Sequence, residues 1–310
     1  MNPVTPDAGI LPDAKPASLV LRLTPSLALP YVQLARLDRP IGWQLLLAPC
    51  WQSAALAGLV RDAGPNVVHL ALFLVGAVAM RGAGSTYNDI VDRKLDAGVA
   101  RTKGRPLPSG RISVKAATVF LVMQSLVGLA VLLCFNSFSI LLAIASLGVV
   151  AIYPLMKRVT AWPQAVLGLA FSWGALIGWA AVYGSLALPA LFLYISAFCW
   201  TIGYDTIYAH QDKEDDALIG VKSSALALGQ HTRPWLFVFY AAAVVLWGMA
   251  GWAVGLSGWF WVGLAAATAQ LLWQAAHVDI GRPADCLTKF RSNRAVGWLM
   301  LAGIVAGHVI

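Results

Sequence analysis

Long apolar segments separated by short polar connections run through almost the whole chain of 310 residues. Each is roughly 20 residues long, the length that a helix needs to cross the hydrocarbon core of a bilayer. Because a backbone in lipid must satisfy its hydrogen bonds internally, and the segments are too long for barrel strands, they predict helices. We therefore expect an all-α membrane protein with about nine transmembrane helices, over residues 41–60, 66–86, 116–134, 137–156, 162–182, 188–209, 234–254, 258–277 and 294–310.

Composition supports this pattern and argues against a soluble protein. Hydrophobic residues make up 59% of the chain and charged residues 12%, with a mean hydropathy of +0.72, whereas soluble domains carry about 25% charged residues. Residues 1–24 differ from the rest, because they contain Pro3, Pro6, Pro12 and Pro16 and no long apolar segment. We predict that this segment is disordered and that a single transmembrane domain covers residues 25–310.

The net charge of +8 is distributed on one side of the predicted membrane. Apart from Arg61, the Lys and Arg residues precede the first apolar segment or follow the second, fourth, sixth and eighth. The positive-inside rule makes that side cytoplasmic, and it explains the charge without a nucleic-acid partner. Asp7 and Asp13 argue against a transit peptide, so we expect a multi-pass protein of a bacterial cell inner membrane, with an organelle as the alternative.

Two acidic clusters interrupt the apolar pattern at matching places, each directly after a long apolar segment and both on the basic side. They cover residues 87–96 and 204–216. Each cluster offers two carboxylates four residues apart, which are Asp92 with Asp96 and Asp212 with Asp216. On a helix this spacing puts both groups on one face, where like charges repel unless a cation lies between them. Hard oxygen ligands of this kind suit Mg²⁺, so we predict a divalent metal site.

Two metal-binding turns at a membrane face predict a particular kind of ligand. Carboxylates bind a diphosphate only through a metal that bridges both anions. A lipid-linked diphosphate would place its head at that face and its tail in a central cavity among the helices. The clusters suggest two related halves, each donating one turn, and the connections over residues 87–115 and 210–233 would form a cytoplasmic cap over the cavity.

Basic residues on the same side have two interpretations each. Lys157 either extends to the interface or contacts a leaving diphosphate, and Arg158 offers a contact to a substrate carboxylate. Arg36 either faces the same site or reflects the positive-inside rule alone. The loop over residues 103–110 is basic and rich in Gly and Pro, and it is either a simple connector or part of the site.

Several motifs resemble those of the UbiA-type intramembrane aromatic prenyltransferases. They are Asn88-Asp89-x-x-Asp92-x₃-Asp96, the Arg-Pro-Leu-Pro-Ser-Gly loop at 105–110, Tyr153-x₃-Lys157, and Tyr204-Asp205-Thr206-x-Tyr208-Ala209-x-x-Asp212. The first motif alone is similar to the whole superfamily. The segments 38–42 and 220–224, together with the second acidic motif, resemble the subgroup of ubiquinone biosynthesis. The resemblance covers roughly residues 33–300 and shows no departure at the metal positions.

The resemblance implies a reaction and a set of site residues. A polyprenyl group would pass from polyprenyl diphosphate to the 3-position of 4-hydroxybenzoate, with release of diphosphate. The cofactor would be Mg²⁺, held by Asn88, Asp92, Asp96, Asp212 and Asp216. Asp92, Asp212 and Lys157 would be catalytic, with Asp212 as a candidate proton acceptor. The residues that contact substrate would be Arg36, Lys103, Arg105, Tyr153, Lys157 and Arg158.

Two other functions fit parts of the pattern. A related enzyme would prenylate another acceptor, such as haem or a naphthoate, and only an acceptor assay separates these cases. A transporter would also carry acidic residues, but near the middle of its spans, whereas these lie at span ends. The sequence indicates the two substrates and membrane lipid as partners, and it indicates no nucleic-acid or protein partner.

Overall fold

The computed structural model describes residues 19–307, and this part of the chain contains α-helices, short 3₁₀ turns and no strand. The predicted all-helical fold is therefore confirmed for this part of the chain. Nine helices of the described part have 19 residues or more. They are α3 (Ile41–Val60), α4 (Val67–Asp96), α5 (Val114–Leu132), α6 (Ser137–Val159), α7 (Pro163–Tyr183), α8 (Leu188–Ala209), α11 (Thr232–Ala253), α12 (Gly258–His277) and α13 (Pro283–Ala306).

Six segments of the described chain are long and apolar enough to cross a membrane by length and composition. They are Val67–Asp96, Val114–Leu132, Ser137–Val159, Pro163–Tyr183, Leu188–Ile219 and Ser224–Ala253. The helices α3, α12 and α13 are not among them. Polar side chains explain the difference, because α3 and α12 contain Gln and several Trp residues, and α13 begins with a charged stretch.

The observed helix bounds correct one expectation near the C-terminal end of the chain. The last long helix, α13, begins at Pro283 and not at residue 294, because its charged first half packs inside the bundle, where Lys289 and Asn293 are buried. Of the segment 1–24 that was predicted to be disordered, the described part includes a short helix, α1 (Leu19–Leu23). Residues 1–18 and 308–310 lie outside the described residues.

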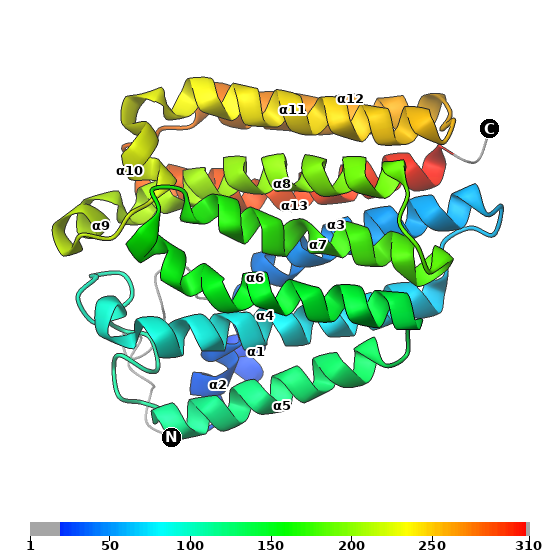
Figure 1. Cartoon of the computed structure of the whole chain (residues 1–310). Helices are drawn as coiled ribbons and strands as arrows, with labels where there is room; N and C mark the ends of the chain where they lie inside the picture. The colour runs from blue at the N-terminus through cyan, green and yellow to red at the C-terminus, as the bar shows by residue number, and fades with distance from the viewer. Residues whose placement is uncertain (1–18, 308–310) are drawn as a thin grey trace.

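The long helices lie side by side, and the α4–α5 connection is at the same end as the short helices α9 (Lys213–Ile219) and α10 (Ser224–Leu228), on the left of Figure 1. The end of α4 and its first acidic cluster are at this end too. Two 3₁₀ turns, η1 (His210–Asp212) and η2 (Gly229–His231), join these short helices to α8 and α11. The two longest connections therefore meet at the end that carries both acidic clusters.

Helix α3 packs against α7 through small residues. A Cβ atom added at Gly178 would lie 2.5 Å from the Cys50 carbonyl oxygen and 2.9 Å from the Ala54 nitrogen. Only glycine lets the two backbones come this close, as in other membrane helix pairs. The contact joins α7 to the buried core formed by α3, α8, α11, α12 and α13.

Helices α5 and α6 form a different part of the bundle. Helix α5 packs on α4 and α6 packs on α7, whereas α5 and α6 touch each other little. Their outward apolar side chains are exposed, as Met123, Leu126, Leu141 and Ile152 illustrate. This is the surface expected for contact with lipid. A cavity lies inside the bundle, between the α4–α5 pair and the α6, α7 and α8 helices.

Candidate active site

The cavity has a volume of about 650 Å³ and is lined by side chains of different character along its length. Apolar residues from α4, α5, α6 and α7 line its interior, among them Met80, Leu132, Leu147 and Phe171. Polar and charged residues line the end that carries the acidic clusters, among them Asn88, Asp96, Tyr153, Lys157, Asp212 and Asp216. A ligand with a charged head and an apolar tail matches this arrangement.

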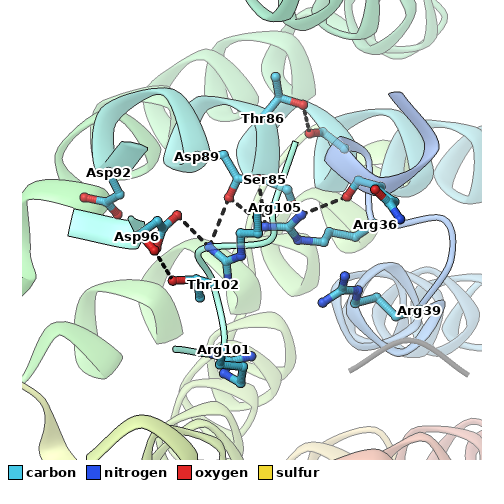
Figure 2. Close-up of polar contacts among 12 residues, drawn as sticks. Arg36, Arg39, Ser85, Thr86, Asp89, Asp92, Asp96, Arg101, Thr102 and Arg105 are labelled. Carbon is cyan, nitrogen blue, oxygen red and sulfur yellow. Dashed lines mark hydrogen bonds and ion pairs between the residues drawn. The ribbon is translucent and has the colours of Figure 1, made fainter. Parts of the chain in front are cut away.

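The first acidic cluster is held by two arginines from neighbouring connections, as Figure 2 shows. Asp89 is fully buried and accepts two hydrogen bonds from Arg36 Nη2, at 2.6 and 2.9 Å. Arg105 Nη1 lies between two carboxylates, 3.2 Å from Asp89 and 2.8 Å from Asp96. Arg36 and Arg105 both line the cavity, so the α4 carboxylates come with their own counter-charges.

The pKa values of Arg36 and Arg105 shift in opposite directions, because burial outweighs pairing at one and pairing outweighs burial at the other. Burial lowers the pKa of Arg36 to about 10, although Asp89 acts the other way. Burial also acts to lower the pKa of Arg105, but Asp89 and Asp96 outweigh it and the pKa is raised. Both side chains therefore stay cationic at neutral pH, and both are available to an anion at the cavity mouth.

Asp92 lies one helical turn further along α4 than Asp89 and has different partners. Its carboxylate is fully buried beneath the end of α6, 2.6 Å from Lys157 Nζ and 3.2 Å from Arg158 Nη2. Lys157 lines the cavity, whereas Asp92 is covered by its two partners and does not. A cation at Asp92 would therefore have to displace Lys157.

The second acidic cluster has a different backbone from the one expected. Helix α8 ends at Ala209, and Asp212 lies on the 3₁₀ turn η1, with Asp216 one turn into α9. Both nevertheless line the cavity. Arg101 from the α4–α5 connection pairs with Asp212 and donates a hydrogen bond to the Tyr208 hydroxyl. The first connection therefore reaches across the mouth to the second cluster.

A metal would have to change these pairings. Among residues 19–307, no three His, Cys, Asp or Glu side chains lie close enough together to share an ion. The donor chemistry nevertheless fits Mg²⁺, because one amide and three carboxylates line the same mouth, from Asn88, Asp96, Asp212 and Asp216. Asp96 and Asp212 now have arginine partners where a cation would otherwise balance them.

The cavity wall includes most of the residues predicted to contact substrate, but not all of them. Arg36, Arg105, Tyr153 and Lys157 line it. Lys103 is exposed on the connection and is not part of the wall. Arg158 is 45% exposed, pairs with Asp92 from outside and also lies off the wall. The predicted contact of Arg158 with the acceptor carboxylate stays a prediction. Adjacent residues on a helix point about 100° apart, and of these two side chains Lys157 is the one that lines the cavity.

The sequence analysis assigned no site role to two charged residues deeper in the cavity, Arg81 on α4 and Asp205 on α8, although Asp205 belongs to the second acidic cluster. Arg81 Nη1 donates a hydrogen bond to Ser85 Oγ at 2.8 Å, and its guanidinium lies 5.4 Å from the centre of the Phe171 ring. Its Nε is buried and has no hydrogen-bond partner among residues 19–307. The signal was available, because a charge inside an apolar membrane segment marks a functional site by default.

Comparisons with known proteins place this site in context. The chain is 51% identical to the mitochondrial 4-hydroxybenzoate polyprenyltransferase of Drosophila pseudoobscura pseudoobscura, over 96% of this chain and 74% of that protein. It is 46% identical to the human protein of the same name, over 94% and 79% of the two chains. The protein of that name from Arabidopsis thaliana is 48% identical, over 90% and 68%.

Solved structures share the same fold. The apo structure of a UbiA homolog from Aeropyrum pernix K1 matches with a TM-score of 0.72 and 26% identity, over 85% of this chain and 97% of that one. A UbiA homolog from Archaeoglobus fulgidus bound to GPP and Mg²⁺ matches with a TM-score of 0.62 and 19% identity, over 91% and 100%. At that lower identity the likeness concerns the fold alone.

The relatives also correct one expectation. They are mitochondrial proteins of eukaryotes, from flies, a plant and mammals. This finding overturns the assignment to a bacterial inner membrane, which rested on two acidic residues in the N-terminal segment. The model of the UbiA prenyltransferase family matches residues 46–302, the part that forms the bundle and the cavity. The chain belongs to the UbiA prenyltransferase family.

Proposed function

We propose that the protein transfers a polyprenyl group from polyprenyl diphosphate to the 3-position of 4-hydroxybenzoate and releases diphosphate, the prenyl-transfer step of ubiquinone biosynthesis. Relatives that are 46% to 52% identical over most of the chain carry this activity in their names. The observation that carries the proposal is the cavity itself: it is apolar inside, and carboxylates and cationic side chains of both motifs surround its mouth.

The two acidic motifs are proposed to hold Mg²⁺ through Asn88, Asp92, Asp96, Asp212 and Asp216. When bound, Mg²⁺ would neutralise diphosphate charge and so make diphosphate a better leaving group. The solved homolog with GPP and Mg²⁺ supports this for its own chain. In this chain Asp92 and Asp212 are the most informative ligands, because each comes from a different motif and each is paired with a cationic side chain.

The cationic side chains at the mouth are proposed to bind the diphosphate. Lys157, Arg36 and Arg105 line the cavity and are now paired with carboxylates. When a cation takes over those carboxylates, the same donors are free to turn to phosphate oxygens. Lys157 supports the departing charge, because a compact ammonium can follow a single phosphate oxygen. Tyr153 offers an aromatic face beside it for the allylic carbon.

Arg81 is proposed to bind the carboxylate of 4-hydroxybenzoate. It lies in the wall of the cavity, and among the described residues its N–H groups make one hydrogen bond, to the Ser85 hydroxyl. A guanidinium can hold a carboxylate with two parallel hydrogen bonds. Asn88 is seven residues further along α4, two turns or roughly 10 Å nearer the mouth. The acceptor would then lie below the diphosphate, next to the allylic carbon.

The membrane arrangement is also a proposal. All nine long helices would cross the membrane, with residues 25–310 as one prenyltransferase domain. The α4–α5 connection and the segment from η1 to η2 would form a cap over the mouth, supported by the hydrogen bond from Ala100 N to Asp215 Oδ2 at 3.1 Å. The names of the relatives support a mitochondrial membrane, with the mouth on the side that carries the basic connections.

A magnesium-dependent assay with an acceptor panel tests the proposal. Membranes that contain the protein are given a polyprenyl diphosphate, and either 4-hydroxybenzoate, a dihydroxynaphthoate or haem. The proposal expects a prenylated product from 4-hydroxybenzoate only, and none when EDTA removes the metal. Product from another acceptor, with none from 4-hydroxybenzoate, would assign the protein to a different branch of its family.

A further inference from the structure

Asp205 is a carboxylate inside the cavity that the proposed function does not use. It lies on α8 within the apolar part of the bundle and lines the cavity wall. A carboxylate at this depth is costly, and in membrane proteins such groups mark functional sites. Its neighbour Thr206 is bonded to Ser224, so the local polar groups do not explain Asp205.

Asp205 has no hydrogen bond or ion pair with any described residue. The other carboxylates around the cavity differ: Asp96 pairs with Arg105, and Asp212 pairs with Arg101. Asp216 lines the wall as well, but it lies at the mouth with the metal motif. Asp205 is therefore a deep carboxylate whose oxygens are available to a ligand in the cavity.

The position of Asp205 matches that of Arg81 on the opposite side of the cavity. Arg81 precedes Asn88 by seven residues on α4, and Asp205 precedes Asp212 by seven residues along α8 and η1. A spacing of seven keeps residues on nearly the same helix face, two turns apart. Both charges thus lie roughly 10 Å below their own metal motif. Both line the cavity, and no ion pair joins them in the described structure, so both can turn to a ligand there.

We propose that Asp205 is the general base that removes the phenolic proton of the acceptor; this rests on the proposed function. A phenol has a pKa near 10, so 4-hydroxybenzoate enters with its hydroxyl protonated. With the substrate carboxylate on Arg81, the hydroxyl at the other end of the ring is directed across the cavity to Asp205. Asp212, the earlier candidate, is a poorer base because Arg101 already holds its carboxylate.

Asp205 takes the phenolic proton, and the phenolate pushes electrons to the ring carbon beside it. That carbon forms a bond to the allylic carbon while the bond from the allylic carbon to the diphosphate oxygen breaks, and diphosphate leaves. In the resulting dienone, the ring carbon that now carries the prenyl group loses its hydrogen to water as a proton. Protonated Asp205 returns its proton to the ring oxygen, so one proton is released in each turnover.

The test compares three variants with the wild-type protein. D205N removes the base and keeps the shape, D205E restores a carboxylate, and D62N is the matched control. Asp62 is exposed and has a left-handed backbone conformation that Asn tolerates well. For each protein, kcat/KM for 4-hydroxybenzoate is measured at saturating prenyl diphosphate and Mg²⁺, between about pH 6 and pH 10. This range ends near the pKa of a phenol.

The groups that share the cavity around Asp205, and that must stay unchanged in the comparison, are Arg81 on α4, Tyr153 on α6, Tyr204 on α8 and Arg291 on α13. We expect D205N to lose about 10²- to 10⁴-fold in kcat/KM at pH 7. Its rate should then rise about tenfold per pH unit toward the pKa of the phenol, as the substrate ionises without help. D205E should keep the pH profile of the wild type, and D62N should match it fully.

Two outcomes for D205N would overturn the inference. One is an unchanged kcat/KM, and the other is a loss of the same size at every pH, which indicates a structural role. If D205N does not insert, the wild-type profile decides: a rate that already rises tenfold per pH unit up to the phenol pKa shows that no internal base acts. A wild-type protein that does not prenylate 4-hydroxybenzoate at any pH contradicts the proposed function instead.

Discussion

Arg81 gives the sharpest prediction about the acceptor. Its side chain is confined, because its Nε and Nη2 would lie 2.5 and 3.2 Å from a Cβ atom at Gly42. Phe171 and Ser85 hold it on other sides. Arg81→Gln removes the charge and keeps a polar side chain. Ser85 Oγ also donates to the Arg81 carbonyl oxygen at 2.8 Å, so it stays bonded in the variant and the helix should persist.

The size of the effect follows from the contact that is lost. A hydrogen bond to a charged group contributes about 1.5–3 kcal/mol, and each 1.4 kcal/mol is about tenfold in affinity. Arg81→Gln should therefore raise KM for 4-hydroxybenzoate by about 10- to 100-fold. The KM for the prenyl diphosphate should change little, because the diphosphate lies at the mouth. For Arg81→Lys, KM for 4-hydroxybenzoate should lie between the wild-type and Arg81→Gln values. The ammonium keeps the charge but cannot make two parallel hydrogen bonds.

The assay measures both KM values by product formation at saturating Mg²⁺, with 4-hydroxybenzoate and with its uncharged amide. The amide has no carboxylate, so wild type and Arg81→Gln should use it equally poorly. Arg93→Lys, on the exposed side of α4, is the matched control. If Arg81→Gln raises only KM for the diphosphate, or if Arg158→Lys alone raises KM for the acceptor, the assignment of the carboxylate to Arg81 is wrong.

Three further predictions concern the metal, the leaving group and the packing. Asp92→Ala or Asp212→Ala should abolish prenyl transfer at saturating Mg²⁺ while the protein still inserts; near-normal turnover in either variant refutes a site shared by both motifs. Lys157→Ala should lower kcat more than it raises KM, because diphosphate charge grows in the transition state; steady-state kinetics would contradict this if only KM changed. Gly178→Val should destabilise the protein by several kcal/mol, since its Cβ would lie 2.5 Å from a backbone oxygen of α3; an unchanged thermal midpoint in detergent would disprove that close contact.

The sequence predicts the helices well because a membrane makes the signal strong. Each predicted span overlaps a long helix, and α4 carries the first acidic cluster on its last turns as expected. The start of α13 was missed because Lys289 and Asn293 read as polar connection, yet both are buried among other helices. Hydropathy alone cannot distinguish a charged loop from a charged helix whose polar groups are satisfied inside the bundle.

The site was predictable as a set of motifs but not as a set of pairings. Spacing brought out the four carboxylates, yet nothing in it shows that Arg101 and Arg105 cross the mouth to reach Asp212 and Asp96. The choice between Lys157 and Arg158 depended on how the end of α6 is rotated, which spacing does not fix. Arg81 lies inside the predicted span 66–86, but it was counted only as one of the basic residues of the positive-inside pattern.

The central claim is that both acidic motifs hold one metal–diphosphate site at the mouth of the cavity. The most direct measurement is a structure of the protein with Mn²⁺ and a non-hydrolysable prenyl diphosphate analogue, using anomalous scattering to locate the metal. The account predicts Mn²⁺ between α4 and η1, with carboxylate oxygens of both motifs about 2.0–2.3 Å away and the prenyl tail in the apolar cavity. A metal bound to one motif alone, or an analogue outside the cavity, would contradict it.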